Sequence, residues 1–186
     1  MDTSTLPARE RILLTAHDLF YRDGIRATGV DRLIAASGVA KLTFYRHFAS
    51  KDDLIRAFLA YRHERWMAWL RDALDRHGAT PAGGLAPLLA ALAEWFEDPA
   101  FRGCAFINTV AEVGVSLPDA VAIAQNHKRD MAEVIATLLT PGAQREAIAQ
   151  AVAVAVDGAI VRAQLEGAAP ALDSLRLLLT LHGDFM

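Results

Sequence analysis

The chain has 186 residues, of which 53% are hydrophobic and 22% charged, a composition that supports a packed core and excludes an intrinsically disordered chain. Its single cysteine, Cys104, excludes an intrachain disulfide and any metal centre built from several cysteines. The formal net charge is −3, yet residues 1–56 carry nine basic and seven acidic side chains, a net of +2, whereas residues 57–186 carry ten and fifteen, a net of −5. The N-terminal part is therefore the better candidate for binding nucleic acid.

Neither a secretory signal nor a membrane span is predicted. The N-terminal segment MDTSTLPARER places an acid before its bases and is not followed by an apolar block. The most apolar stretch, AIAQAVAVAVDGAIV, is interrupted by Gln150 and Asp157, which predicts a helix in a protein core. We therefore expect a cytoplasmic protein that has no membrane contact.

Helical periodicity begins near the N-terminus. The first helix is predicted from about Ala8 to Asp23, because Ile12, Ala16, Leu19 and Phe20 share one face and Gly24 follows as a stop signal. A second helix is predicted from about 28 to 37. Thr28 and Asp31 form the S/T-x-x-acid signal of a helix start, and the pair Ser37-Gly38 marks its end.

The next helix must start almost at once, and it is predicted from Val39 to Phe48. Val39, Leu42 and Phe44 are available for packing, which leaves as outward-facing candidates Ala40, Lys41, Thr43, Tyr45 and His47. Two helices joined by so tight a turn predict a helix-turn-helix, whose second helix contacts DNA bases. Ser50 and Asp53 repeat the capping signal, so a further helix is predicted to begin at Lys51.

This pattern resembles the DNA-binding signature of the TetR family of repressors over about residues 9 to 58. The matching residues are Ile12, Ala16, Leu19, Phe20, Gly24, Thr28, Val30, Ile34, Ala35, Gly38, Val39, Lys41, Thr43, Phe44, Tyr45, His47, Phe48, Ser50 and Lys51. Leu42 and Gly29 depart from the family pattern, in which a small residue and a second hydroxyl residue are common. The resemblance implies an all-α protein. Residues 1–52 would form a three-helix DNA-binding head with a helix-turn-helix, and residues 53–186 a helical effector-binding and dimerisation domain.

Six residues are predicted to bind double-stranded operator DNA. The resemblance places Tyr45 and His47 on DNA phosphates, and Thr28 is included in the binding set. Lys51 combines a positive charge with a helix start, and both attract phosphate. Lys41 and Thr43 are candidates for reading bases, because lysine donates to guanine O6 and N7 and threonine offers a hydroxyl and a methyl group. An ordinary solvated surface is the alternative interpretation for Tyr45, His47 and Lys51.

Apolar periodicity continues beyond Lys51 and predicts helices for the rest of the chain. A long helix should run to about Gly78, and further helices are predicted at about 84–97, 101–114, 118–140, 143–166 and 171–184. The last two carry apolar residues on more than one face, so they must be covered on both sides. The resemblance implies that these two helices form the interface of a homodimer.

Aromatic residues in the middle of the chain suggest a ligand site. By the resemblance, the surrounding helices enclose an effector pocket, to which we assign the rings of Trp66, Trp69, Trp95 and Phe106. Polar groups there that could orient an apolar small molecule are Asn108, Glu112, Asn126 and His127. Core packing, for the aromatic residues, and an exposed helix face, for the polar ones, are the alternative interpretations.

No catalytic or metal-binding pattern emerges from the sequence. HERW at 63–66 lacks the second histidine of a zinc-binding helix, and a G-x-S-x-G motif is absent. We predict a DNA-binding regulator that is not an enzyme and needs neither a cofactor nor a metal. It should be a homodimeric repressor, released from a palindromic operator by a small apolar effector. The alternative is an effector-independent DNA-binding regulator controlled by a protein partner.

Overall fold

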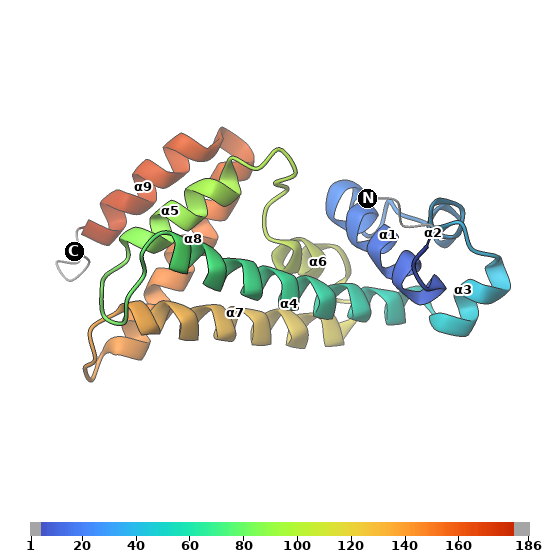
Figure 1. The fold of residues 1–186 in the computed structure, drawn as a ribbon, viewed down its shortest axis with the longest axis horizontal. Coiled ribbons are helices and arrows are strands. Elements are labelled where there is room, and N and C mark those ends of the chain that lie inside the picture. Colours follow the sequence, from blue (N-terminus) through green and yellow to red (C-terminus); the bar gives the residue numbers. More distant parts are fainter. Residues whose placement is uncertain (1–4, 181–186) are drawn as a thin grey trace. The chain divides into compact units, whose positions relative to one another are not determined.

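The computed structural model describes residues 5–180 and is all-α, as predicted. Within that range it contains nine helices and no strand, in the order α1 (Ala8–Asp23), α2 (Val30–Ser37), α3 (Lys41–His47), α4 (Lys51–Arg76), α5 (Ala86–Phe96), α6 (Ala105–Val113), α7 (Pro118–Leu138), α8 (Arg145–Glu166) and α9 (Ala168–Thr180) (Figure 1). Each corresponds to one predicted helix. The predicted extension of the last helix to residue 184 lies outside the described residues.

The chain forms two compact units. The first contains the residues up to Glu64 together with Ala105–Ala124, and the second contains Arg65–Cys104 together with the residues from Gln125 onward. Helix α6 therefore belongs to the same unit as α1, α2 and α3, although it follows them by some 60 residues in the sequence. The boundary at residue 52 that the family resemblance implied remains a prediction, and these units divide the chain differently.

The first unit holds the helix-turn-helix. Helix α1 packs against α2 and α3, and the three short helices lie together in the blue and cyan part of Figure 1. The face of α1 predicted to be buried is buried: Ile12, Ala16, Leu19 and Phe20 are at most 7% exposed. Burying apolar area of this kind stabilises the fold by about 25 cal/mol per Å². The apolar residues that recur at helical spacing on α1 therefore form part of the core of the head.

Local features of the backbone and side chains determine where α2 ends and where α4 begins. Gly38 has φ +63° and closes α2, with its N–H donating to the Ala35 carbonyl. A side chain would strain this left-handed conformation. Ser50 and Asp53 form the predicted cap of α4, since the Asp53 N–H donates to Ser50 Oγ at 3.0 Å.

The cap predicted for α2 is wrong. The N-cap residue is Gly29, which has no side chain to accept a hydrogen bond. Thr28 is completely buried, and its hydroxyl donates to the Gly24 carbonyl at 2.8 Å and more weakly to the Leu19 carbonyl at 3.5 Å. The hydroxyl thus has partners in the preceding loop and helix that compete with the amides of α2.

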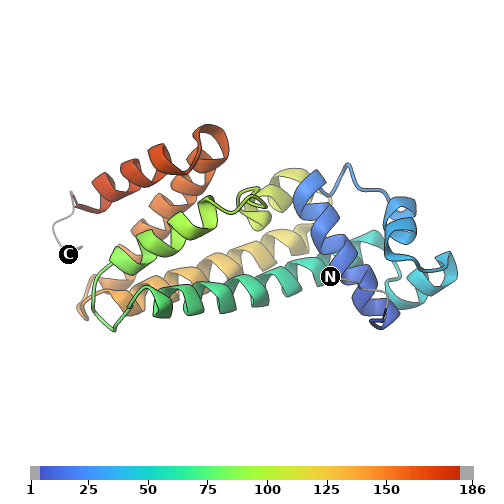
Figure 2. The same cartoon turned by 45° about the horizontal axis from the view of Figure 1, so that its top comes forward.

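The second unit contains α5, α8 and α9. Helix α9 packs against both α8 and α5, and Figure 2 shows α9 in red beside α5 in green. Gly103 has φ +80°, and a side chain there would collide with Gln164 of α8, whose amide donates to the Arg102 carbonyl at 2.8 Å. Helix α8 is long and apolar enough to cross a membrane, a test that core helices of soluble proteins also pass. Its Asp157 is paired with Lys128 at 2.5 Å.

Candidate nucleic-acid interface

Helix α3 has a buried side and an exposed side. Phe44 and Phe48 are 0% and 3% exposed, and the Arg9 guanidinium lies over the Phe48 ring at 5.2 Å. Leu42, which we predicted to be available for packing, is 81% exposed instead. Each residue of a helix advances by about 100°, so Leu42 lies far from the side that Phe44 and Phe48 occupy. The prediction that Leu42 faces the core was therefore wrong.

Four of the predicted DNA-binding residues lie on α3, and two of them have exposed side chains. Lys41 is exposed, and its Nζ lies 3.7 Å from Asp31 Oδ1 of α2, a loose ion pair between two solvated groups. Tyr45 is 43% exposed, and its ring meets Phe44 edge to face at 5.4 Å. Thr43 and His47 are half-buried. A surface ion pair such as that between Lys41 and Asp31 contributes at most about 1 kcal/mol, so Lys41 can leave Asp31 and bind a phosphate or a base.

Sequence reasoning missed one further cation on this surface. Arg46 is exposed and follows Leu42 by four residues, which places both on one face of α3. The signal was present in the sequence, because a helix whose inner side is set by Phe44 and Phe48 must turn residues 42 and 46 outward. An arginine at such a position can donate to phosphate or to guanine.

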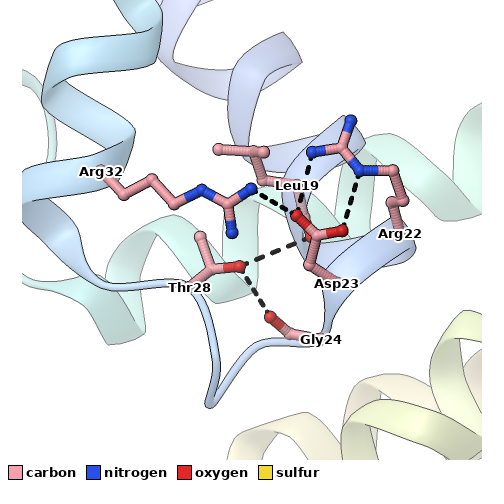
Figure 3. A network of polar contacts seen from close by, with 6 residues as sticks. All are labelled: Leu19, Arg22, Asp23, Gly24, Thr28 and Arg32. Carbon is pink, nitrogen blue, oxygen red and sulfur yellow. Dashed lines mark hydrogen bonds and ion pairs between the residues drawn. The ribbon is translucent and has the colours of Figure 1, made fainter.

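The loop between α1 and α2 is closed by buried and charged contacts (Figure 3). Asp23 accepts from Arg22 at 2.8 Å and from Arg32 of α2 at 2.6 Å. The hydrogen bond from Arg22, helped by Arg32, lowers the pKa of Asp23 to about 2. Thr28 completes the loop from inside, as described above. Because its hydroxyl is buried, Thr28 supports the loop, and its place in the DNA-binding set is no more than a prediction.

Lys51 also contacts this loop. Its Nζ donates to the Ile25 carbonyl at 2.6 Å and lies 5.8 Å from the centre of the Phe20 ring. Burial lowers the pKa of Lys51, while the Glu112 carboxylate opposes that shift. The ammonium group therefore joins the start of α4 to the loop before α2. The phosphate contact assigned to Lys51 from the sequence stays a prediction beside this internal role.

Glu112 of α6 holds the same loop from another side. Its Oε2 accepts the Arg26 N–H at 2.8 Å, and a β-carbon added at Gly24 would lie 3.2 Å from that oxygen. Because 86 residues separate the two groups, no local pattern could have predicted this contact. We had assigned Glu112 to the effector pocket, whereas the N–H from which it accepts belongs to Arg26 in the DNA-binding head.

The other predicted pocket residues divide between the two units. In the second, Trp66 meets His127 at 5.1 Å and Trp95 at 5.4 Å between ring centres, and Trp69 lies 6.1 Å from Trp66. The indole N–H of Trp66 is buried and has no acceptor among the described residues. Asn126 is exposed. Phe106, which is buried, and Asn108 belong to α6 in the first unit, so the pocket as a whole stays a prediction.

Comparison with known proteins agrees with this geometry. Residues 12–58 match the family model of bacterial regulatory proteins of the tetR family. The chain is 24% identical over 145 residues to the HTH-type transcriptional regulator UidR of Escherichia coli strain K12, which covers 78% of this chain and 71% of that protein. A 72-residue segment is 35% identical to the HTH-type transcriptional activator FasR of Mycolicibacterium smegmatis, covering 37% of this chain and 33% of FasR.

Solved structures extend the similarity beyond the head. A TetR-family transcriptional regulator from Streptomyces coelicolor matches with a TM-score of 0.80 and 28% identity, over 90% of this chain and 84% of that one. The regulatory protein TetR from Rhodobacter sphaeroides matches with a TM-score of 0.77 and 25% identity, over 96% and 99% of the two chains. With its helix-turn-helix and its all-α fold, the chain belongs to the TetR family of DNA-binding transcriptional regulators, which are not enzymes.

Proposed function

We propose that this regulator is a cytoplasmic homodimer that represses transcription from a near-palindromic operator and releases it when an apolar small molecule binds. The observation that carries the DNA-binding part is the exposed side of α3. Lys41, Tyr45 and Arg46 offer hydrogen-bond donors there, while the buried Phe44 and Phe48 hold the helix in place. Two such helices in a symmetric dimer would contact two half-sites of the operator.

Exposed apolar residues on the last two helices support dimerisation. On α8 the spacing 154, 158, 161, 165 follows one face, and it includes Val154 at 71% and Leu165 at 76% exposure. On α9, Leu177 is 61% and Leu178 is 48% exposed. Contiguous exposed apolar surface of this kind is typical of protein interfaces, and a two-fold axis lets the same surface serve both subunits.

The aromatic cluster of the second unit supports a ligand of apolar character. Trp66, Trp69, Trp95 and His127 provide ring surface, and the Trp66 N–H, which finds no acceptor within residues 5–180, is a donor that favours a ligand with one hydrogen-bond acceptor. By linkage, a ligand that binds the DNA-free dimer tenfold more tightly than the DNA-bound dimer lowers operator affinity tenfold. Control by a protein partner remains the second candidate function.

DNA selection on random duplexes tests the first part of the proposal. The wild-type protein should enrich a near-palindromic sequence, and Lys41→Ala should relax discrimination at one symmetric pair of positions. Arg129→Ala, at an exposed arginine of α7 in the second unit, serves as the matched control and should enrich the wild-type sequence. If the wild type enriches no sequence, DNA recognition through α3 is refuted.

A fluorescence titration tests the effector part. An apolar compound that binds near Trp66 should change tryptophan emission and release a bound operator duplex at matching concentrations. A compound that changes the emission at saturation but leaves operator affinity unchanged would contradict release. Binding of a protein that releases the operator, with no response to any apolar compound, would favour the second candidate function.

A further inference from the structure

Among the large apolar side chains that the structure describes in the DNA-binding head, Leu42 is the most exposed, at 81%. It lies in the first turn of α3, on the face it shares with Arg46 and away from the buried Phe44. A single exposed leucine is ordinary on a protein surface. Its position on the helix that contacts bases makes this one different, because an apolar side chain there meets base edges once DNA is bound.

The chemistry of the major groove restricts what a leucine can recognise. Guanine presents two acceptors, adenine an acceptor and a donor, and cytosine a donor, none of which leucine can satisfy. Thymine alone presents an apolar group, the C5 methyl, beside its O4 acceptor. A polar base edge that loses its water without gaining a partner is disfavoured. A leucine in the groove therefore favours thymine in two ways, by contact with the methyl group and by exclusion of the other edges.

We propose that Leu42 is a specificity-determining residue that selects a T·A base pair by packing against the C5 methyl group of thymine. The proposal rests on the DNA recognition through α3 proposed above. It differs from the assignment made from the sequence, in which Lys41 and Thr43 were the base-reading candidates. Thr43 also carries a methyl group, but its side chain is half-buried, whereas Leu42 is largely accessible.

Replacement of thymine by deoxyuridine provides a direct test, because it removes only the C5 methyl group and leaves base pairing intact. Each thymine pair of the wild-type consensus is replaced in turn, symmetrically in both half-sites. Contact with one methyl group is worth about 0.8 kcal/mol, or about fourfold in affinity, and two symmetric contacts multiply to about 15-fold. Wild-type protein should show this loss at one symmetric pair of positions.

Three variants identify the side chain responsible. Leu42→Ala should bind the thymine and deoxyuridine duplexes with nearly equal affinity at that pair, and its exposure lets the variant fold. Thr43→Ser removes the other methyl group of the helix and should keep the wild-type loss. Val115→Ala, which shortens an apolar side chain that is 99% exposed outside the recognition helix, controls for a general effect of apolar surface and should also keep it.

The possible outcomes are distinct. The proposal is overturned if Leu42→Ala keeps the thymine preference of the wild type at every position, if the preference disappears in Thr43→Ser instead, or if the wild type tolerates deoxyuridine everywhere. If the wild type enriches no sequence, DNA recognition through α3 is refuted, and the proposal for Leu42 fails with it. Loss of the preference in Leu42→Ala alone establishes the contact.

Discussion

Thr28→Val separates an internal role of Thr28 from contact with DNA. Valine preserves the shape of threonine and leaves no cavity, so the change removes only the hydroxyl. That hydroxyl is fully buried and donates to the Gly24 carbonyl at 2.8 Å, but Gly24 itself is half-buried and water can reach part of it. Loss of a buried partner costs about 1–3 kcal/mol, and the partial exposure of Gly24 places our expectation at about 1–2 kcal/mol.

Two assays on the same variant measure this effect. Urea unfolding at constant protein concentration should show the loss of stability, and operator titrations across salt concentrations should show an unchanged slope. A lost phosphate contact would lower the slope of log affinity against log salt by about one. Thr28→Ser keeps the hydroxyl and serves as the control for both assays. A variant with unchanged unfolding free energy and a slope reduced by about one would refute the internal role and place Thr28 on the DNA.

Three further changes test the loop and the proposed dimer. Glu112→Ala should speed hydrogen exchange of the Arg26 amide, because that N–H loses its acceptor, and an unchanged rate would show that the contact does not hold the loop. Leu177→Asp should give a folded monomer in sedimentation, since its 61% exposure lets a single subunit tolerate the charge; a dimer that persists places the interface elsewhere. Asp23→Asn should be less stable than wild type at pH 7. That difference should close as pH falls from about 4 to about 2, because the stability that Asp23 contributes is complete above its unfolded pKa and is lost as pH falls through its folded pKa of about 2; urea unfolding across this range measures it.

Sequence alone was sufficient to predict the helices and the family. Ile12, Ala16, Leu19 and Phe20 recur at helical spacing, and each is buried where that spacing placed it. Gly38 ends α2 because the turn needs a left-handed residue, and that requirement involves only adjacent residues. Signals of this kind are readable because helical spacing and helix termination depend on residues only a few positions apart in the sequence.

The two capping signals show where local reasoning stops. Ser50 and Asp53 form the predicted cap, whereas the same signal at Thr28 and Asp31 does not. In the second case the hydroxyl has a better partner in Gly24, which becomes available only after the loop folds against α1. The sequence pattern shows which groups can form a hydrogen bond, but the packing of the loop determines which of these bonds forms.

Tertiary structure alone decided which side chains are free to meet a ligand. Lys51 and Glu112 were predicted to contact DNA and an effector, and the structure adds hydrogen bonds from Lys51 to the Ile25 carbonyl and from the Arg26 N–H to Glu112, both in one loop. Leu42 and Phe44 were both candidates for packing, and the burial of Phe44 in the folded head shows which of the two faces the core. Contacts such as that between Glu112 and Arg26 join residues 86 positions apart, and only the folded chain brings those groups together.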